Sequence, residues 1–166
     1  MIHDRDLLDR LEKLDPVSWS GIVFRHMLGD YPPSRENTRG ARWNPPGVAA
    51  IYTSLERDTA LAEAEYRLSL EPIPVRAPRT IYTIRISLGK ALDLTSRDFL
   101  QDLGLAERDL LGDDRSRCQR IGAAVAWLAH DGLLVPSARS GGTNLVIYPT
   151  ELDPASQFDV VDQESI

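Results

Sequence analysis

The pattern of apolar residues changes its period near residue 16, which predicts a helix followed by a strand. The helix is predicted over residues 4–14, where four leucines fall on one helical face: Leu7, Leu8, Leu11 and Leu14. The pair Asp15–Pro16 ends this helix, because a proline disfavours the helical conformation of the residue before it. Residues 19–27 are predicted to form a strand whose apolar run, residues 22–24, is buried, and Arg25 directly follows that run.

Glycines and prolines are dense over residues 29–47, which predicts a long ordered loop rather than regular structure. Loops of this length in a compact domain are usually functional. A short apolar strand is predicted next, over residues 48–53. Ser54 is then placed to cap a helix over residues 55–70.

Strands and helices alternate through the rest of the chain. Alternating apolar positions predict a strand over residues 80–88, and two short helices follow at 96–103 and 106–111. A longer helix is predicted over residues 115–130, with Gly132 marking its end. Further short strands are predicted at residues 133–135, 144–148 and 158–161.

This mixed order favours a single α+β domain with a mixed sheet flanked by helices. The domain is expected to span residues 1–166, with its core at about 20–150 and a C-terminal extension at about 151–166. A length of 166 residues fits one domain, and 42% hydrophobic with 27% charged residues is typical of a globular protein.

The formal net charge of −6 disfavours nucleic-acid binding, which depends on neutralising phosphates, but a local basic pocket could still bind a small anion. Cys118 is the one cysteine, so an internal disulfide is excluded, and with three histidines it gives no metal-ligand spacing. No metal is expected. The charged N-terminus and the lack of about 18 consecutive apolar residues predict a cytoplasmic protein without a membrane span.

Three residues on one predicted loop–strand–helix stretch carry the main chemical signal: Arg42, Tyr52 and Glu63. An arginine fork matches a pyrophosphate, a strand-end ring can stack on a base, and a carboxylate can engage a ribose. The alternative is a surface arginine, a core tyrosine and a solvated glutamate. Glu65 competes with Glu63, but the two point roughly 200° apart on a helix, so Glu65 is expected to pair with Arg67 or with solvent.

Arg25 and Ser137 are weaker candidates when taken singly. A charge after a buried strand can be structural, and a serine before a Gly-Gly turn is usually a turn residue. Serine-hydrolase, Rossmann and P-loop signatures are absent from the sequence. The acidic residues of 109–114 are expected to form a solvated loop, and three tryptophans are expected to anchor the core: Trp19, Trp43 and Trp127.

Taken together, several pieces in order resemble the RES domain family, the toxin halves of RES–Xre toxin–antitoxin pairs. The resemblance covers roughly residues 20–150 and rests on Phe24-Arg25, Arg42-Trp43-Asn44-Pro45-Pro46-Gly47, Ile51-Tyr52-Thr53-Ser54, Ala60-Leu61-Ala62-Glu63, Gly132 to Arg139 and Gly142 to Val146. It implies a split sheet around an NAD cleft, similar to ADP-ribosyltransferase toxins. It also implies an Xre-type antitoxin that blocks the cleft within a hetero-oligomeric complex.

Members of the family destroy NAD by hydrolysis or phosphorolysis, and some ADP-ribosylate a protein. On this resemblance Glu63 would stabilise the charge that develops on the ribose, while Arg42 and Arg25 clamp the pyrophosphate. Tyr52 would stack on nicotinamide, and Ser137 would bind the ribose or orient Glu63. Asn144 joins the residues expected to bind NAD.

The acceptor of ADP-ribose stays open among water, phosphate and a protein side chain. Basic residues expected around the cleft favour an anionic acceptor: Arg35, Arg39 and Arg139. Two other functions compete with NAD cleavage. A non-catalytic module would hold a nucleotide or a partner segment in the same cleft, and a toxin that cuts RNA is disfavoured by the acidic charge and by the lack of a His or Lys constellation.

Overall fold

A mixed β-sheet organises the part of the chain that the computed structural model describes, residues 2–166. Six strands are present there: β1 (Val17–Leu28), β2 (Ile51–Ser54), β3 (Arg79–Asp93), β4 (Gly132–Pro136), β5 (Thr143–Ile147) and β6 (Gln157–Ser165). The helices of these residues are α1 (Arg5–Glu12), α2 (Arg57–Ser69), α3 (Arg97–Asp102), α4 (Glu107–Leu111), α5 (Ser116–Trp127) and the short 3-10 helix η1 (Pro149–Glu151).

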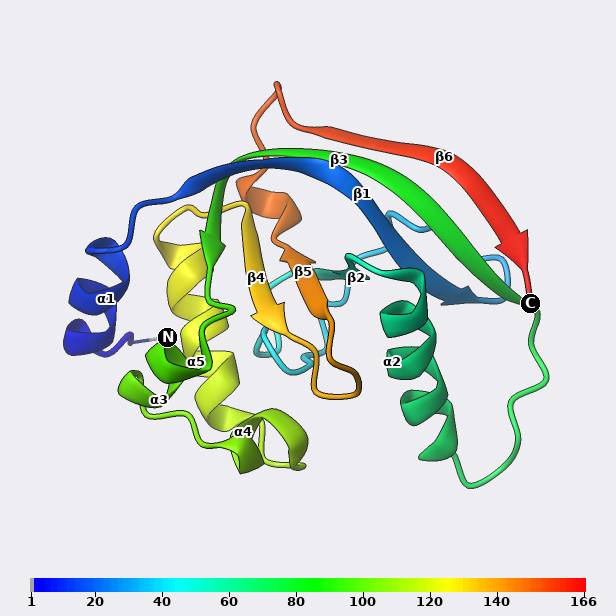
Figure 1. The fold of residues 1–166 in the computed structure, drawn as a ribbon, viewed down its shortest axis with the longest axis horizontal. Helices are drawn as coiled ribbons and strands as arrows, with labels where there is room; N and C mark the ends of the chain where they lie inside the picture. Colours follow the sequence, from blue (N-terminus) through cyan, green and yellow to red (C-terminus); the bar gives the residue numbers. More distant parts are fainter. Residues whose placement is uncertain (1) are drawn as a thin grey trace.

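The sheet curls back on itself. The strand order is β1-β2-β5-β4-β3-β6, and an additional pairing of β1 with β3 closes a ring of five strands. The β3–β4 pair is parallel and the other pairs are antiparallel. The long strands β1, β3 and β6 arch over the short strands β4, β5 and β2 (Figure 1). This arrangement confirms the predicted α+β class with a split, mixed sheet.

One strand joins the two parts of the sheet. The first two thirds of β3 lie between β1 and β6, and its last residues, Ala91 to Asp93, pair with β4. In β3 the buried Ile84, Ile86 and Leu88 alternate with the exposed Arg85, which is the predicted period of two. A fully buried side chain of this kind contributes about 1.5–3 kcal/mol to folding.

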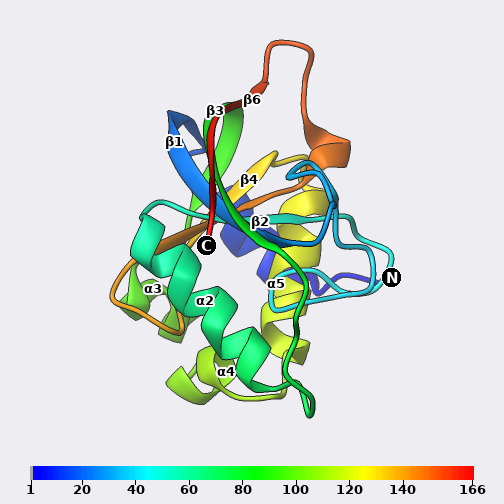
Figure 2. The ribbon, with the colours of Figure 1, turned by 90° about the vertical axis from the view of Figure 1, so that its right-hand side faces the viewer.

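Helices cover the sheet unequally. A large apolar cluster joins α1, α3, α4 and α5 to the sheet through residues such as Leu11, Leu100, Ile121 and Val135. In Figure 1, α2 lies on the other side of β4 and β5 from these helices, and the turned view of Figure 2 places α2 in front of them. In residues 2–166, no helix is both long and apolar enough to cross a bilayer.

Two predicted helix boundaries are wrong. Ser54 does not cap α2: the helix begins at Arg57 after Glu56, and the Ser54 hydroxyl donates to Asn144 instead. Helix α5 ends at Trp127, five residues before the predicted Gly132, and Ala129 follows with a positive φ of 62°. Gly132 is the first residue of β4, where a Cβ would lie 2.6 Å from the Cδ1 of Leu88. Close packing of strands, not helix capping, therefore requires this glycine.

Two predicted environments also differ from the structure. Trp127 does not anchor the core, because 68% of its surface is exposed, whereas Trp43 is buried as predicted. Asp109 is buried rather than solvated, since its carboxylate accepts a hydrogen bond from the Ala106 N–H and closes the first turn of α4. A strand boundary differs as well: β6 runs over Gln157–Ser165 and is longer than the strand predicted at residues 158–161.

Candidate active site

A cavity of about 570 Å³ lies between β1, β2, α2, the loop that contains Arg42, and the β4–β5 turn. Its lining includes five of the predicted site residues: Arg25, Arg42, Tyr52, Glu63 and Asn144. The volume falls within the range of small-molecule sites. Residues up to 119 positions apart in sequence are therefore brought to one concave surface.

The Glu63 carboxylate is held by two side chains, one from Ser137 directly after β4 and one from Asn144 in β5. The Ser137 hydroxyl donates to Glu63 Oε1 at 2.7 Å, and the Asn144 amide donates to the same oxygen at 2.9 Å. Within the described part of the chain, no donor reaches Glu63 Oε2. Hydrogen bonds to a charged oxygen are about twice as strong as neutral ones, so Oε1 is anchored and Oε2 is left for a ligand.

Ser137 is 2% exposed and does not line the cavity. Of the two roles predicted for it, binding ribose or orienting Glu63, its contacts fit the second. The Ser137 hydroxyl oxygen also accepts a hydrogen bond from the backbone N–H of Arg139 at 3.1 Å, which ties the β4–β5 turn to the carboxylate.

Ser54 fixes the orientation of the Asn144 amide. Its hydroxyl donates to Asn144 Oδ1 at 2.8 Å, and the two residues are paired across β2 and β5. Because an ionised carboxylate only accepts hydrogen bonds, the NH₂ group of Asn144 must face Glu63, and Ser54 must then be the donor. Sequence reasoning missed this role for Ser54. Its direct pairing with Asn144 depends on the strand register, which the sequence does not display.

Arg25 braces the long loop against β1. Its guanidinium donates to the carbonyl of Pro33 and, at 2.7 Å, to the carbonyl of Arg35. Burial, followed by the nearby charge of Arg67, lowers the pKa of Arg25 to about 10, so the group stays charged at neutral pH. Arg25 therefore combines a structural role with a place on the cavity wall.

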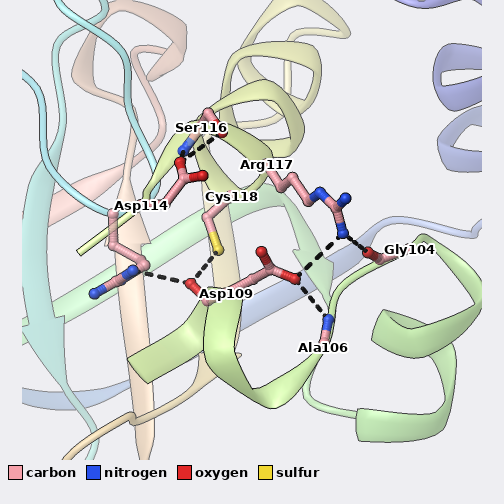
Figure 3. A network of polar contacts seen from close by, with 8 residues as sticks. Gly104, Ala106, Asp109, Asp114, Ser116, Arg117 and Cys118 are labelled. Carbon is pink, nitrogen blue, oxygen red and sulfur yellow. Dashed lines mark hydrogen bonds and ion pairs between the residues drawn. The ribbon is translucent and has the colours of Figure 1, made fainter. Parts of the chain in front are cut away.

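Arg42 is positioned by α4. Its Nη1 donates to the carbonyl oxygen of Asp109 at 2.9 Å, and burial is the main cause that lowers the pKa of this arginine. The buried Cys118 thiol donates to the same carbonyl at 3.3 Å, while the Asp109 carboxylate binds Ala106 N–H at 2.7 Å (Figure 3). Asp109 therefore stabilises the first turn of α4 through its carboxylate and positions Arg42 through its carbonyl oxygen. The sequence did not predict this role, because Asp109 belongs to an acidic run that was expected to be a solvated loop.

The predicted Trp43–Asn44 motif holds Tyr52. The Tyr52 hydroxyl donates to Asn44 Oδ1 at 2.6 Å and accepts from the Trp43 N–H at 2.9 Å. Burial raises the pKa of this phenol, so it stays protonated. The hydroxyl of Tyr52 is therefore engaged by the loop, and the ring is the part left for stacking. Helix α5 contacts this loop at Gly122, where a Cβ would lie 1.8 Å from the Trp43 carbonyl oxygen.

Of the three further arginines predicted around the cleft, Arg139 lines the cavity and the other two do not. Arg35 lies 3.6 Å over the ring of Tyr31, and neither Arg35 nor Arg39 lines the cavity. Glu65 points away from Glu63 as predicted, but its partner is Arg79 at 2.6 Å rather than Arg67. Arg67 and Arg115 do line the cavity, although sequence reasoning did not select either. Isolated arginines in α2 and before α5 carry no sequence signal for this position.

The fold and the cavity define an α+β protein with an arginine-lined cavity of about 570 Å³. The chain belongs to the RES domain family, since the RES domain model matches residues 10–166. It is 33% identical over 157 residues to the NAD(+) phosphorylase MbcT of Mycobacterium bovis and of Mycobacterium tuberculosis, with 89% of this chain and 83% of each relative covered.

The fold is also shared with a solved toxin. The crystal structure of the M. tuberculosis MbcT–MbcA toxin–antitoxin complex matches with a TM-score of 0.87 and 29% identity, covering 98% of this chain and 93% of that one. The predicted family and fold are thereby confirmed. The structural neighbour is a toxin seen together with its antitoxin.

Proposed function

We propose that this protein cleaves the bond between nicotinamide and ribose in NAD and acts as the toxin of a toxin–antitoxin pair. The observation that carries the proposal is the Glu63 carboxylate, anchored through Oε1 by Ser137 and Asn144 on the wall of an arginine-lined cavity. The 33% identity to proteins named NAD(+) phosphorylase supports NAD as the substrate.

Glu63 acts on the charge that forms during cleavage. As the bond to nicotinamide lengthens, the ribose ring gains oxocarbenium character, and a fixed carboxylate stabilises that state more than the neutral ground-state sugar. The free oxygen of Glu63 accepts a hydrogen bond from the ribose 2′-hydroxyl and lies beside the developing charge. Anchoring of the other oxygen keeps the carboxylate from rotating away, so no reorganisation is needed during the reaction.

The cationic wall binds the rest of the substrate. Arg25 and Arg42 hold the pyrophosphate, and the Tyr52 ring stacks on nicotinamide. The leaving nicotinamide departs neutral, so the reaction needs no strong general acid. The lining agrees with this requirement: His26 also lines the cavity, but burial and neighbouring arginines lower its pKa to about 4.

The partner is an antitoxin of the Xre type that covers the cavity in a hetero-oligomeric complex in the cytoplasm, where NAD is available. The likeness to a chain solved as a toxin–antitoxin complex supports this partner.

The test measures nicotinamide release from NAD by the purified protein, with and without inorganic phosphate. We expect Glu63→Gln to lower the rate by roughly 10²–10³-fold, the usual cost of one lost electrostatic contact. Glu65→Gln is the matched control, because Glu65 lies on the same helix and pairs with Arg79 outside the cavity. Folded wild-type protein that leaves NAD intact under both conditions would overturn the proposal.

A further inference from the structure

The cavity has an apolar end away from Glu63. Its lining there comes from the end of β1, the loop after it and the end of α2: Met27, Leu28, Tyr31, Leu68 and Leu70. The chain leaves much of this surface uncovered, since Tyr31 is 52% and Leu70 57% exposed. Glu63 and Leu70 are seven residues apart in sequence, which is about 10 Å along a helix. This end therefore suits the adenine of a dinucleotide whose other ribose lies at Glu63.

Tyr31 presents one face of its ring to the cavity. The Arg35 guanidinium lies 3.6 Å from the centre of this ring, and Tyr31 lines the cavity whereas Arg35 does not. The cation therefore covers the ring face that is turned away from the cavity, and the opposite face is open. Nucleobases stack on exposed aromatic rings, so we expect the adenine to lie against Tyr31.

Arg67 lies between this apolar end and the reacting centre. It is in α2, four residues after Glu63 and three before Leu70, and it lines the cavity. Burial is the main cause that lowers the pKa of Arg25, and the charge of Arg67 is the next cause, so the two guanidinium groups lie close together. Within residues 2–166, the exposed Arg67 side chain has no hydrogen-bond acceptor. Its donors therefore face the place where the adenosine ribose of a bound dinucleotide would lie.

No carboxylate competes with Arg67 at this position. Among residues 2–166, Glu63 is the one acidic residue of the cavity lining, and Glu65 pairs with Arg79 at 2.6 Å outside the cavity. Dinucleotide sites that select NAD hold the adenosine 2′-hydroxyl with a carboxylate, and sites that accept NADP place an arginine near it. The reason does not depend on the fold: a carboxylate accepts from the hydroxyl and repels a phosphate, whereas an arginine binds the phosphate.

The net charge of the lining leads to the same substrate. Among residues 2–166, five arginines and one glutamate line the cavity, a net charge of +4, whereas the whole chain has a net charge of −6. The pyrophosphate of NAD carries two negative charges and its nicotinamide one positive charge, so NAD neutralises only part of this wall. A 2′-phosphate adds about −1.5 to −2 charges at neutral pH. NADP therefore complements the lining better than NAD does.

We propose that this site also cleaves NADP and that Arg67 binds its 2′-phosphate, an inference that rests on the proposed function. The bond from C1 of the nicotinamide ribose to nitrogen breaks, and its electron pair stays on nicotinamide, which leaves neutral. With water as the acceptor, the water oxygen bonds to C1 and one of its protons passes to solvent. The 2′-phosphate remains on the adenosine ribose of the product.

The experiment compares kcat/KM for NADP and for NAD, measured by nicotinamide release from the purified protein. We expect NADP to be cleaved at least as efficiently as NAD. Arg67→Gln should lower the ratio of the two values by roughly tenfold, the lower end for a hydrogen bond to a charged group, because Arg67 is exposed. Arg67→Lys, which keeps the charge, should retain part of the preference for NADP.

Arg57→Gln is the matched control for the kinetics. Arg57 lies on the same helix and pairs with Glu164 at 2.8 Å outside the cavity, so its loss should leave the ratio unchanged. The proposal is wrong if the protein cleaves NAD but leaves NADP intact, or if Arg67→Gln lowers kcat/KM equally for both dinucleotides.

Calorimetric titration with two mononucleotides gives a measurement that does not depend on turnover. Adenosine 2′,5′-bisphosphate should bind with a lower Kd than adenosine 5′-monophosphate, and Arg67→Gln should remove that difference. Tyr31→Ala should weaken both, because both carry the adenine. Equal affinity of the wild type for the two nucleotides would overturn the 2′-phosphate site even if NAD is cleaved. A bisphosphate preference that depends on Arg67, with neither dinucleotide cleaved, would overturn the proposed function and leave the phosphate site standing.

Discussion

Removing the Ser137 hydroxyl isolates the anchoring of the proposed catalytic carboxylate without touching the cavity wall. Ser137 is 2% exposed and donates to Glu63 Oε1 at 2.7 Å, one of two hydrogen bonds to that oxygen. A hydrogen bond to a charged group is worth about 1.5–3 kcal/mol, which corresponds to roughly 10- to 150-fold in rate if it is needed only in the transition state. We therefore expect Ser137→Ala to lower kcat by that factor with little change in the KM for NAD.

The same change has a structural cost that must be measured separately. The backbone N–H of Arg139 loses its acceptor, which costs about 1–3 kcal/mol of folding free energy if water does not replace the hydroxyl. Urea unfolding of the variant therefore accompanies the kinetics, which are run far below the melting temperature. Ser140→Ala is the matched control, because Ser140 lies in the same turn as Ser137 but its hydroxyl is hydrogen-bonded to Thr59 of α2 and does not contact Glu63.

A double-mutant cycle with Asn144→Ala completes the test. Both side chains donate to one oxygen, so their effects on kcat should be non-additive. Full additivity, or a Ser137→Ala enzyme within about twofold of the wild-type kcat, would refute the anchoring argument. A loss confined to the KM for NAD would instead return Ser137 to a ribose-binding role.

Three further predictions concern stability and reactivity. Gly122→Ala should destabilise the protein by about 1–3 kcal/mol in urea unfolding and lower activity, because its Cβ would lie 1.8 Å from the Trp43 carbonyl oxygen of the Arg42 loop; wild-type stability would contradict this packing. Burial raises the pKa of Cys118 to about 12, so a thiol reagent at pH 8 should label the native protein far more slowly than the denatured one. Burial lowers the pKa of His26 to about 4 in the folded state, so the free energy of unfolding should fall as the pH drops from about 6.5 towards 4. The His26→Gln variant should show a smaller fall over that pH window. An identical fall in the variant would exclude this histidine as the cause.

Local signals in the sequence predicted most elements, because they depend on short-range periodicity. Alternation gave the correct face of β3, and the two short helices predicted at 96–103 and 106–111 correspond to α3 and α4. The wrong boundaries have a common origin. Ser54 and Gly132 are good capping residues, yet both are used by strands that pack from distant parts of the chain. Local propensity is overridden wherever a tertiary contact competes for the same group.

The sequence alone determined that this is an acidic α+β protein with an arginine, an aromatic and a carboxylate in a shared stretch, because those features depend on composition and spacing; the RES family entered as a resemblance of several motifs in order. Tertiary structure decided which oxygen of Glu63 is anchored, how Asn144 is oriented, and why Asp109 is buried beneath Arg42. It also separated the arginines that line the cavity, Arg67, Arg115 and Arg139 among them, from Arg35 and Arg39, which do not. The physical reason is that hydrogen-bond partners and local charge density depend on strand register and on the closing of the sheet, which join residues far apart along the chain.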